Sequence, residues 1–493
     1  MLEKLFENPF QAQLFGFLWM KLQGITLSEL TGIVMLVTLG YVLLIPWRKS
    51  LRPLELVGLI FPFGVSGMGV ILLLFLLLFP SYLSFESLAC SILLICWIIL
   101  SLDFLKNKKE YWKWPHMMRQ IKRVFQRVKE LNLIQILCLM LISYILFVIG
   151  LKGIFWPILD WDAITTFDFY GRSIAVEKEL ITSIVRDKSV GSGVAYPPLT
   201  HLMIAYSYLA GFYDPKIFFT LTYVSFILAF YAFTRRFVNR TGSMIIVLLM
   251  IMTPELTAFS TFCKTNILQM LFSSLGILVF FRWMSERKLP LLYLAAVLVG
   301  FGAWVRSEGV EFVLIPGLFL FYETIRGQLK WNQLIGYGVI GLVPFLFWQI
   351  FLSATPELGH YQQVEVEKSI FWDAEKLYMI IGYLQNHLAS VQYYGLASYF
   401  LILLLVINLL FFKRAHNHQF GLILLGLVIM HVFLLYQLHY KGDNMEWLLK
   451  YSLKRYIFNW IPLIYFFIGT SFGFQWLTRK LESFLKLQPK EAK

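Results

Sequence analysis

Residues 131–172 read LNLIQILCLMLISYILFVIGLKGIFWPILDWDAITTFDFYGR, an apolar run that changes abruptly into a polar segment rich in carboxylates. The run over 131–156 is long enough to cross a bilayer as a helix, which requires about 20 apolar residues. Asp160, Asp162 and Asp168 follow directly, among aromatic side chains that mark the headgroup region. Ionisable groups at a membrane boundary are costly and usually functional, so this loop is expected to carry the chemistry.

The composition of the whole chain supports a membrane protein. Of its 493 residues, 58% are hydrophobic and only 15% are charged. Ordinary soluble domains are about 45–50% apolar and about 25% charged. The net charge of +14 does not indicate nucleic-acid binding, because the basic residues cluster in short loops between apolar runs, as cytoplasmic loops of membrane proteins do.

Apolar runs recur along the chain about fourteen times. They lack the alternation of barrel strands, and only helices or closed barrels satisfy backbone groups in lipid. We therefore predict an all-α polytopic membrane protein with about 13–14 transmembrane helices and further helices in the outer loops. The runs are 28–46, 55–79, 86–105, 131–154, 198–212, 217–234, 242–258, 265–283, 289–305, 309–325, 335–354, 393–412, 419–437 and 456–477.

The distribution of Lys and Arg predicts how the helices are oriented. The strongly basic connection 106–130 is expected in the cytoplasm, which places the loops 153–197, 355–392 and 438–455 outside. Several later basic loops fit this alternation. The basic segment 235–240 fits only if the short run 198–212 does not cross fully, and we expect that it does not.

Three regions of the chain are predicted from this layout. Residues 1–130 form extra N-terminal helices and the basic loop, 131–477 form a catalytic membrane module, and 478–493 form a basic cytoplasmic tail.

Several short motifs occur in an informative order. WDAITTFDFYGR (161–172) opens the outer loop, YPPL (196–199) leads the next helix, and RSEG (306–309) and KRYIFNWIP (454–462) come later. Over about 131–475 the chain resembles the GT-C superfamily of polytopic glycosyltransferases. Within this superfamily it is similar to the bacterial enzymes related to protein mannosyltransferases and lipid A aminoarabinose transferases.

The resemblance implies a catalytic acidic residue near the start of the first large outer loop. Asp162 or Asp160 matches that position, and Asp168 is a third candidate. The chain departs from the family pattern at Tyr196, where some relatives have Lys. It also lacks an aspartate that many relatives have within 255–266.

The chemistry implied by the resemblance is transfer of a sugar from a polyprenyl-phosphate donor. It needs a base for the acceptor hydroxyl, cations for the departing phosphate and a groove open to lipid. Arginine binds phosphate through a fork of donors, which makes the outer arginines strong candidates. The candidate donor-binding or substrate-binding residues are Arg172, Tyr196, His201, Lys264, Arg306, Glu308, Lys454 and Arg455.

Structural roles compete with functional ones at several of these positions. Asp160 fits a capping role, His201 fits a packed or interfacial residue, and Arg306 and Glu308 fit a simple ion pair at the end of a span. No Cys/His metal spacing occurs, and the need for a divalent metal stays open.

The sequence is thus expected to encode an inverting glycosyltransferase of the cell envelope. It would be a multi-pass protein of the bacterial inner or plasma membrane, acting on the extracytoplasmic face. Its partners would be a polyprenyl-phosphate sugar donor, a glycan, lipid or protein acceptor and the lipid bilayer, with no nucleic acid. The alternatives are a transporter or flippase for lipid-linked saccharides and a polymerase or ligase of such saccharides. A transporter would favour inverted repeats and charges near the midplane, and neither pattern is visible.

Overall fold

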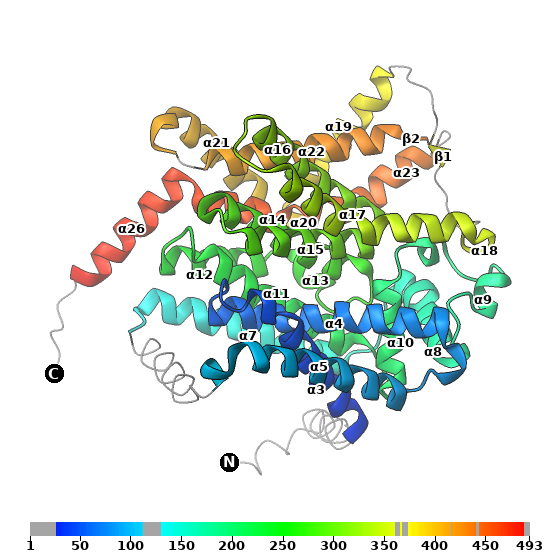
Figure 1. Ribbon diagram of the computed structural model, residues 1–493. Coiled ribbons are helices and arrows are strands. Elements are labelled where there is room, and N and C mark those ends of the chain that lie inside the picture. The colour runs from blue at the N-terminus through cyan, green and yellow to red at the C-terminus, as the bar shows by residue number, and fades with distance from the viewer. Residues whose placement is uncertain are drawn as a thin grey trace, which may run out of the picture.

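The computed structural model describes residues 26–111, 130–359, 365–366, 373–415, 417–439 and 443–487. Helices form nearly all of the regular structure in these ranges (Figure 1), which confirms the predicted all-α class. The strands among the described residues are the antiparallel two-residue segments β1 (Glu365–Val366) and β2 (Leu438–His439). Most of the predicted basic connection 106–130 lies outside the described residues.

The N-terminal helices pack closely on one another and on the central helices. Gly40 and Gly64 permit this contact, because an added Cβ would lie 1.8 Å from the Ile60 carbonyl oxygen and 2.0 Å from the Leu36 carbonyl oxygen, respectively. Small residues serve this purpose at many membrane helix interfaces. The elements are α3 (Leu27–Leu43), η1 (Ile45–Trp47), α4 (Pro53–Leu78), η2 (Pro80–Tyr82) and α5 (Phe85–Tyr111).

The predicted outer loop is largely helical, as expected. Asn132 caps the helix that precedes it by accepting from the Gln135 N–H at 2.9 Å. A π-helical turn joins Asp162 to Asp168, and such turns are frequent at functional sites. The elements are α7 (Leu133–Phe155), η3 (Ala163–Asp168), α8 (Phe169–Glu177), α9 (Ser183–Arg186), η4 (Ser192–Ala195) and α10 (Leu199–Leu209).

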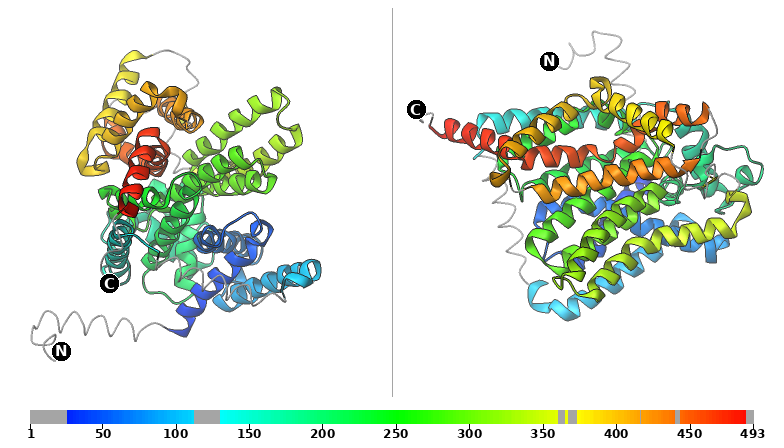
Figure 2. Two further views of the ribbon diagram at one scale, coloured as in Figure 1. Left: turned by 90° about the vertical axis from the view of Figure 1, so that its left-hand side faces the viewer. Right: turned by 90° about the horizontal axis from the view of Figure 1, so that it is seen from above.

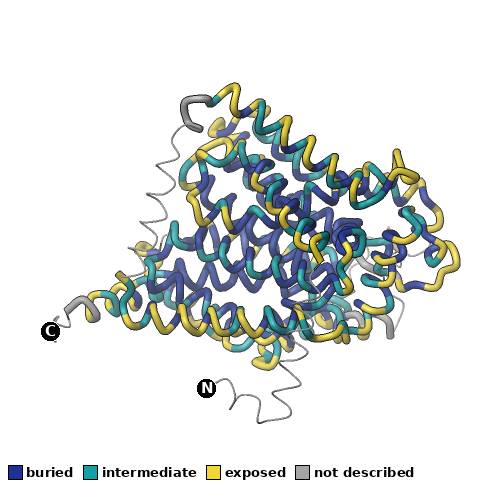
Figure 3. Tube along the Cα trace, turned by 90° about the horizontal axis from the view of Figure 1, so that it is seen from below, coloured by how far each residue is buried: buried dark blue, intermediate teal, exposed yellow. Residues whose placement is uncertain are grey.

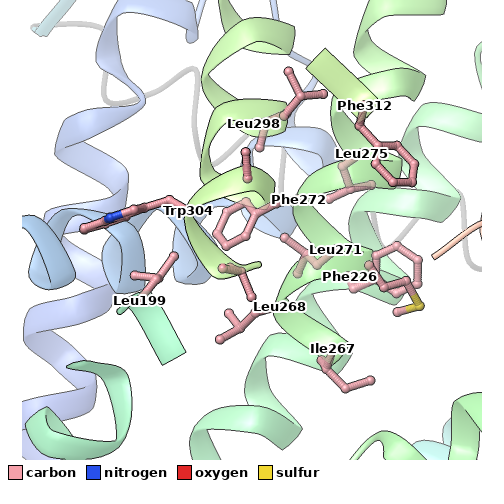
Figure 4. Packing of buried hydrophobic residues seen from close by; sticks show 14 of the residues in the cluster. Leu199, Phe226, Ile267, Leu268, Leu271, Phe272, Leu275, Leu298, Trp304 and Phe312 are labelled. Carbon is pink, nitrogen blue, oxygen red and sulfur yellow. The ribbon is translucent and has the colours of Figure 1, made fainter. Parts of the chain in front are cut away.

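The central helices form the core of the bundle. The apolar stretch of α14 is completely buried. Figure 3 shows buried helices surrounded by more exposed ones. Figure 4 shows Leu268 and Phe272 of α14 gathered with Trp304 of α15. The elements are α11 (Lys216–Thr234), α12 (Arg240–Ile251), α13 (Pro254–Phe259), α14 (Thr265–Glu286), α15 (Leu289–Val305), η5 (Ser307–Val310), α16 (Glu311–Ile325), α17 (Trp331–Ala354) and α18 (Pro356–Gly359).

The C-terminal helices complete the bundle. The chain bends by 62° between α25 and α26, and α26 extends away from the other helices (Figure 2). The elements are α19 (Ala374–Ala389), α20 (Val391–Tyr394), α21 (Ala397–Leu410), η6 (Phe412–Arg414), α22 (His418–Gln437), α23 (Asp443–Tyr451), α24 (Leu453–Ile457), α25 (Ile461–Thr470) and α26 (Phe472–Leu487).

Seven described helices are long and apolar enough to cross a membrane, or up to eight if the bent pair counts as one span. Four further apolar helices (α3, α12, α15 and α21) have between 10 and 17 residues. The predicted apolar runs thus form helices, but not all of them form long straight spans. Helix α10 has 11 residues, which corresponds to about 16 Å against a hydrocarbon core of about 30 Å. Its length supports the expectation that this run does not cross fully.

A buried carboxylate joins the basic segments at one end of the bundle. Glu55 at the start of α4 accepts from Arg236 Nε at 2.6 Å and from Arg282 Nη1 at 2.9 Å. The contact confirms that the basic segment after α11 lies at the same end as the other basic segments, as the charge distribution predicted. We call this the Glu55 end. Its assignment to the cytoplasm stays a prediction.

Candidate active site

Three segments that are distant in sequence meet at the end of the bundle opposite the Glu55 end. The Asp162 carboxylate, just before η3, lies 3.0 Å from Lys264 Nζ and 2.8 Å from Arg455 Nη1. Lys264 precedes the first turn of α14, and Arg455 lies in α24. The structure therefore brings three of the predicted site residues into one cluster.

Asp160 belongs to the same cluster but in a different role. Its Oδ1 lies 2.6 Å from Lys264 Nζ and also accepts from the Ala163 backbone N–H at 3.0 Å. The second contact shows that Asp160 takes part in local backbone capping. The Asp162 side chain is 36% exposed and that of Asp160 is 19% exposed, so Asp162 is the more accessible to a substrate.

The two cations control the ionisation of Asp162. Partial burial acts to raise the pKa of this carboxyl, because it penalises the charged form. The charges of Arg455 and Lys264 and the hydrogen bonds from both outweigh burial, so the pKa of Asp162 lies below its ordinary value. In the free protein this group is an ionised carboxylate held by two cations.

Arg306 forms a buried group with aromatic side chains and a carboxylate. Its Nη2 lies 2.8 Å from Glu308 Oε1, so the ion pair considered from the sequence is present. The guanidinium also lies over the rings of Tyr196 at 4.8 Å and Tyr456 at 5.2 Å. Burial acts to raise the pKa of Glu308, but the Arg306 charge, the hydrogen bonds from Arg306 and the backbone and the charge of His431 together outweigh burial and lower that pKa.

The adjacent residues Lys454 and Arg455 bind different carboxylates. Lys454 Nζ lies 3.3 Å from Glu255 Oε1 and 5.0 Å from the ring centre of Tyr393. Arg455 binds Asp162. Glu255 therefore pairs with Lys454 and not with Lys264, the other charged residue of the segment 255–266.

Asp168 and Arg172 lie on another face of the loop, and each contacts Tyr208. Tyr208 donates to Asp168 at 2.6 Å, and the exposed Arg172 lies 5.7 Å from the Tyr208 ring centre. Burial raises the pKa of Asp168, although the hydrogen bond from Tyr208 opposes the rise. The structure does not bring these two predicted residues into contact with Asp162.

His201 is enclosed by aromatic rings. Its side chain is fully buried, 5.4 Å from the ring centre of Phe167 and 4.9 Å from that of Tyr170. Neither ring nitrogen has a hydrogen-bond partner within the described part of the chain. This environment matches the packed-residue alternative and differs from the predicted contact with substrate.

A cavity of about 380 Å³ adjoins the carboxylates. Asp160, Lys152 and Lys216 contribute charged groups to its wall, and Trp156, Trp161 and Phe262 contribute aromatic ones. Neither lysine was among the site residues predicted from the sequence. They lie at the ends of α7 and α11 that are away from the Glu55 end, whereas the basic residues are expected to gather at the Glu55 end, and this exception could have been noticed in the sequence.

A second buried pair lies close to the arginines and was also missed. His431 Nδ1 lies 2.8 Å from Glu311 Oε2, and the His431 ring contacts Tyr456 and Trp460. The pair joins α16 to α22 and supports the Tyr456 ring on which Arg306 rests. Nothing in the spacing of these residues indicated the contact.

The cluster is rich in cations and poor in metal ligands. Within the described ranges, no group of three or more His, Cys, Asp and Glu side chains is placed to hold a metal ion. The carboxylates near Asp162 are each engaged with Lys or Arg.

Comparison with known proteins gives one family match. Residues 196–348 match the family of dolichyl-phosphate-mannose-protein mannosyltransferases, which belongs to the GT-C superfamily. No curated protein and no solved structure matches the chain. The matched stretch begins at Tyr196 and includes Lys264, Arg306 and Glu308. The family match over residues 196–348, the all-helical fold and the helices long enough to span a membrane together support a membrane glycosyltransferase of the GT-C type in general terms.

Proposed function

We propose that this protein transfers a sugar from a polyprenyl-phosphate-linked donor to an acceptor hydroxyl, with inversion, on the extracytoplasmic face. The observation that carries the proposal is the placement of Asp162 between Lys264 and Arg455 at the end of the bundle away from the Glu55 end. A carboxylate and two cations at a membrane boundary supply a base and an anion site in one place.

Asp162 acts as the general base in this proposal. It is the most exposed carboxylate of the cluster, and both of its cation contacts involve Oδ2. Asp160 is less suitable, because it is more buried and accepts from the Ala163 backbone N–H. Asp160 positions Lys264, and Lys264 in turn positions Asp162.

The reaction balances with these groups alone. The Asp162 carboxylate takes the proton of the acceptor hydroxyl while the acceptor oxygen forms a bond to the anomeric carbon. The bond between that carbon and the phosphate oxygen breaks, and its electron pair stays on the phosphate. Polyprenyl phosphate leaves as an anion, so no acid is needed on that side.

Arg455 links donor binding to the strength of the base. An arriving phosphate competes with Asp162 for the Arg455 guanidinium, because both are anions of similar hydrogen-bonding geometry. Loss of that cation removes one of the causes that lower the pKa of Asp162, while burial still acts to raise it. The carboxylate therefore becomes a stronger base when the donor is bound.

The two sides of Asp162 suit different substrates. One side contains two arginines: Arg455, and Arg306, whose guanidinium lies over the ring of Tyr456, the residue after Arg455. This arginine-rich side takes the donor phosphate. On the other side, the cavity beside Asp160 has aromatic walls and two lysines, and it takes the acceptor.

Residues 131–477 form the catalytic module. The N-terminal helices support it where α4 packs on α11, with Gly58 against Ala229.

The proposal is tested with purified protein in liposomes that contain a radiolabelled polyprenyl-phosphate sugar. Transfer predicts that free polyprenyl phosphate is released only when an acceptor is present, and that Asp162→Asn abolishes the release. Movement of the intact donor across the bilayer, with no released phosphate, would instead support the transporter alternative.

A further inference from the structure

A second cavity, of about 630 Å³, lies at the Glu55 end of the bundle. Its location follows from two contacts of α26. Gln475 Nε2 donates to the Phe237 carbonyl oxygen at 3.4 Å, one residue after Arg236, and Glu482 accepts from the Thr241 N–H at 3.2 Å. Figure 1 likewise shows α26 at the opposite side of the molecule from α8 and α9. This cavity is therefore separate from the proposed active site.

The wall of this cavity is strongly basic. Four cations line it, and no carboxylate is among the lining residues; the cations are Lys413, Arg414, Arg479 and Lys480. Among the described residues none of the four forms an ion pair with a carboxylate. Arg479 donates to the neutral Gln475 side chain at 2.9 Å.

Glu482, the acidic residue of α26, does not neutralise these cations. It lies on the same helix, but its carboxylate accepts from the first turn of α12. Like charges gathered around one cavity repel one another, and a bound anion would relieve the repulsion. The arrangement thus favours an anionic ligand with several acceptor oxygens, such as a phosphate group.

The position of α26 indicates where this ligand comes from. The helix leaves α25 at an angle of 62°, and its Trp476, Leu477 and Phe484 side chains are more than half exposed. A helix with exposed aromatic and aliphatic groups beside Lys and Arg lies along the membrane interface, with its apolar groups in the acyl boundary. Trp476 also lines the cavity, so the cavity lies at the depth of lipid headgroups.

We propose that this cavity is a binding site for the phosphate-bearing headgroup of an anionic phospholipid, in the leaflet opposite the proposed active site. The four cations surround the headgroup phosphate, and Trp476 packs beside the glycerol region. Bound lipid holds η6, which follows α21, against α26, and so fixes the bend between α25 and α26. This proposal does not depend on the proposed sugar transfer.

Native mass spectrometry of the purified protein with phosphatidylglycerol, measured against phosphatidylcholine, tests the proposal. We expect selective retention of phosphatidylglycerol, weakened by about tenfold or more in Arg479→Gln/Lys480→Gln, since each cation near a headgroup contributes to binding. The matched control is Arg326→Gln/Lys330→Gln, which removes two exposed cations outside the cavity. The control is expected to retain the lipid as the unaltered protein does.

Other outcomes would overturn the proposal. Equal loss of lipid in the control and the cavity variant would show that general surface charge, not this cavity, holds the lipid. Displacement of the lipid by millimolar inorganic phosphate would show a site for a soluble anion instead. The charge-preserving variant Arg479→Lys/Lys480→Arg guards against misfolding. This variant should retain the lipid selectively. If it unfolds at the same temperature as the unaltered protein but does not retain the lipid, the proposal is contradicted.

Discussion

Arg455 Nη1 lies 2.8 Å from Asp162 Oδ2, and this contact joins the loop after α7 to α24, the short helix that precedes α25. The neighbouring Lys454 binds Glu255 instead. Two adjacent cations thus serve two carboxylates, and only one of these carboxylates belongs to the cluster with Lys264. Lys454 can therefore be altered as a matched control for Arg455 without removing a contact of Asp162.

Replacement of Asp162 by Asn is expected to lower the rate of transfer by about two orders of magnitude or more, because the amide cannot take the acceptor proton. Steady-state transfer by purified protein measures the effect, with thermal unfolding as the check on folding. Asp160→Asn is the control. It should lower the rate of transfer less, because it only disturbs the position of Lys264. Near-normal turnover in Asp162→Asn with complete loss in Asp160→Asn would move the base by two residues.

Arg455→Ala is expected to raise the KM for the polyprenyl-phosphate sugar by about ten- to a hundredfold, the cost of one hydrogen bond to a charged group. Lys454→Ala removes the adjacent cation, which binds Glu255, and should leave the KM for the donor nearly unchanged. Initial rates at varied donor concentration separate the two. An equal rise of KM in both variants would show that general positive charge, and not the Arg455 guanidinium, attracts the donor.

The pH at which kcat/KM falls on acidification should depend on the cations around Asp162. In the unaltered protein the pKa of Asp162 lies below its ordinary value of about 3.9, so its carboxylate stays ionised as the pH falls to that range. Arg455→Gln removes a cause that lowers this pKa while burial still raises it. The variant should therefore lose activity at a higher pH as the medium is acidified.

Lys454→Gln is the control for this profile, since its side chain does not contact Asp162. Its acidic limb should coincide with that of the unaltered protein. If the acidic limb of kcat/KM lies at the same pH in Arg455→Gln as in the unaltered protein, another group, and not Asp162, controls the reaction.

Arg306 is buried and forms an ion pair with the partly buried Glu308, so the loss of one partner alone should destabilise the fold. We expect Arg306→Met to lower the free energy of unfolding by about 1–3 kcal/mol, because it leaves a partly buried carboxylate without its cation. Adding Glu308→Gln should recover much of that loss. Thermal unfolding in detergent measures stability, and KM for the donor, measured on the stable double variant, shows whether Arg306 also binds phosphate.

The orientation of the bundle is tested by labelling single cysteines with an impermeant thiol reagent. Cys90 is exposed, whereas Cys96, Cys138 and Cys263 are buried, so Cys90 is first replaced by Ser. A cysteine at Ser189 should react in intact cells, and one at Lys330 should react only after the membrane is opened. The reverse pattern would place Asp162 on the cytoplasmic side and contradict the proposed face of action.

The sequence alone determined the helical class, the positions of the apolar helices and the loop that carries the acidic residues. These features are local, because a backbone in lipid must satisfy its own hydrogen bonds and a run of apolar residues therefore becomes a helix. The charge distribution likewise grouped the basic segments correctly, as the contacts of Glu55 with Arg236 and Arg282 show. The short run at 198–212 was recognised as exceptional from its length.

Tertiary structure decided which of the candidate residues meet. The sequence offered Asp160, Asp162 and Asp168 as candidates, but Asp168 accepts from Tyr208 at the end of the π-helical turn, while Asp160 and Asp162 both bind Lys264. His201 is packed in the core, and Lys152 and Lys216 line a cavity. Such contacts join residues on different helices, and they depend on the close packing of side chains along the whole bundle, which no local pattern encodes.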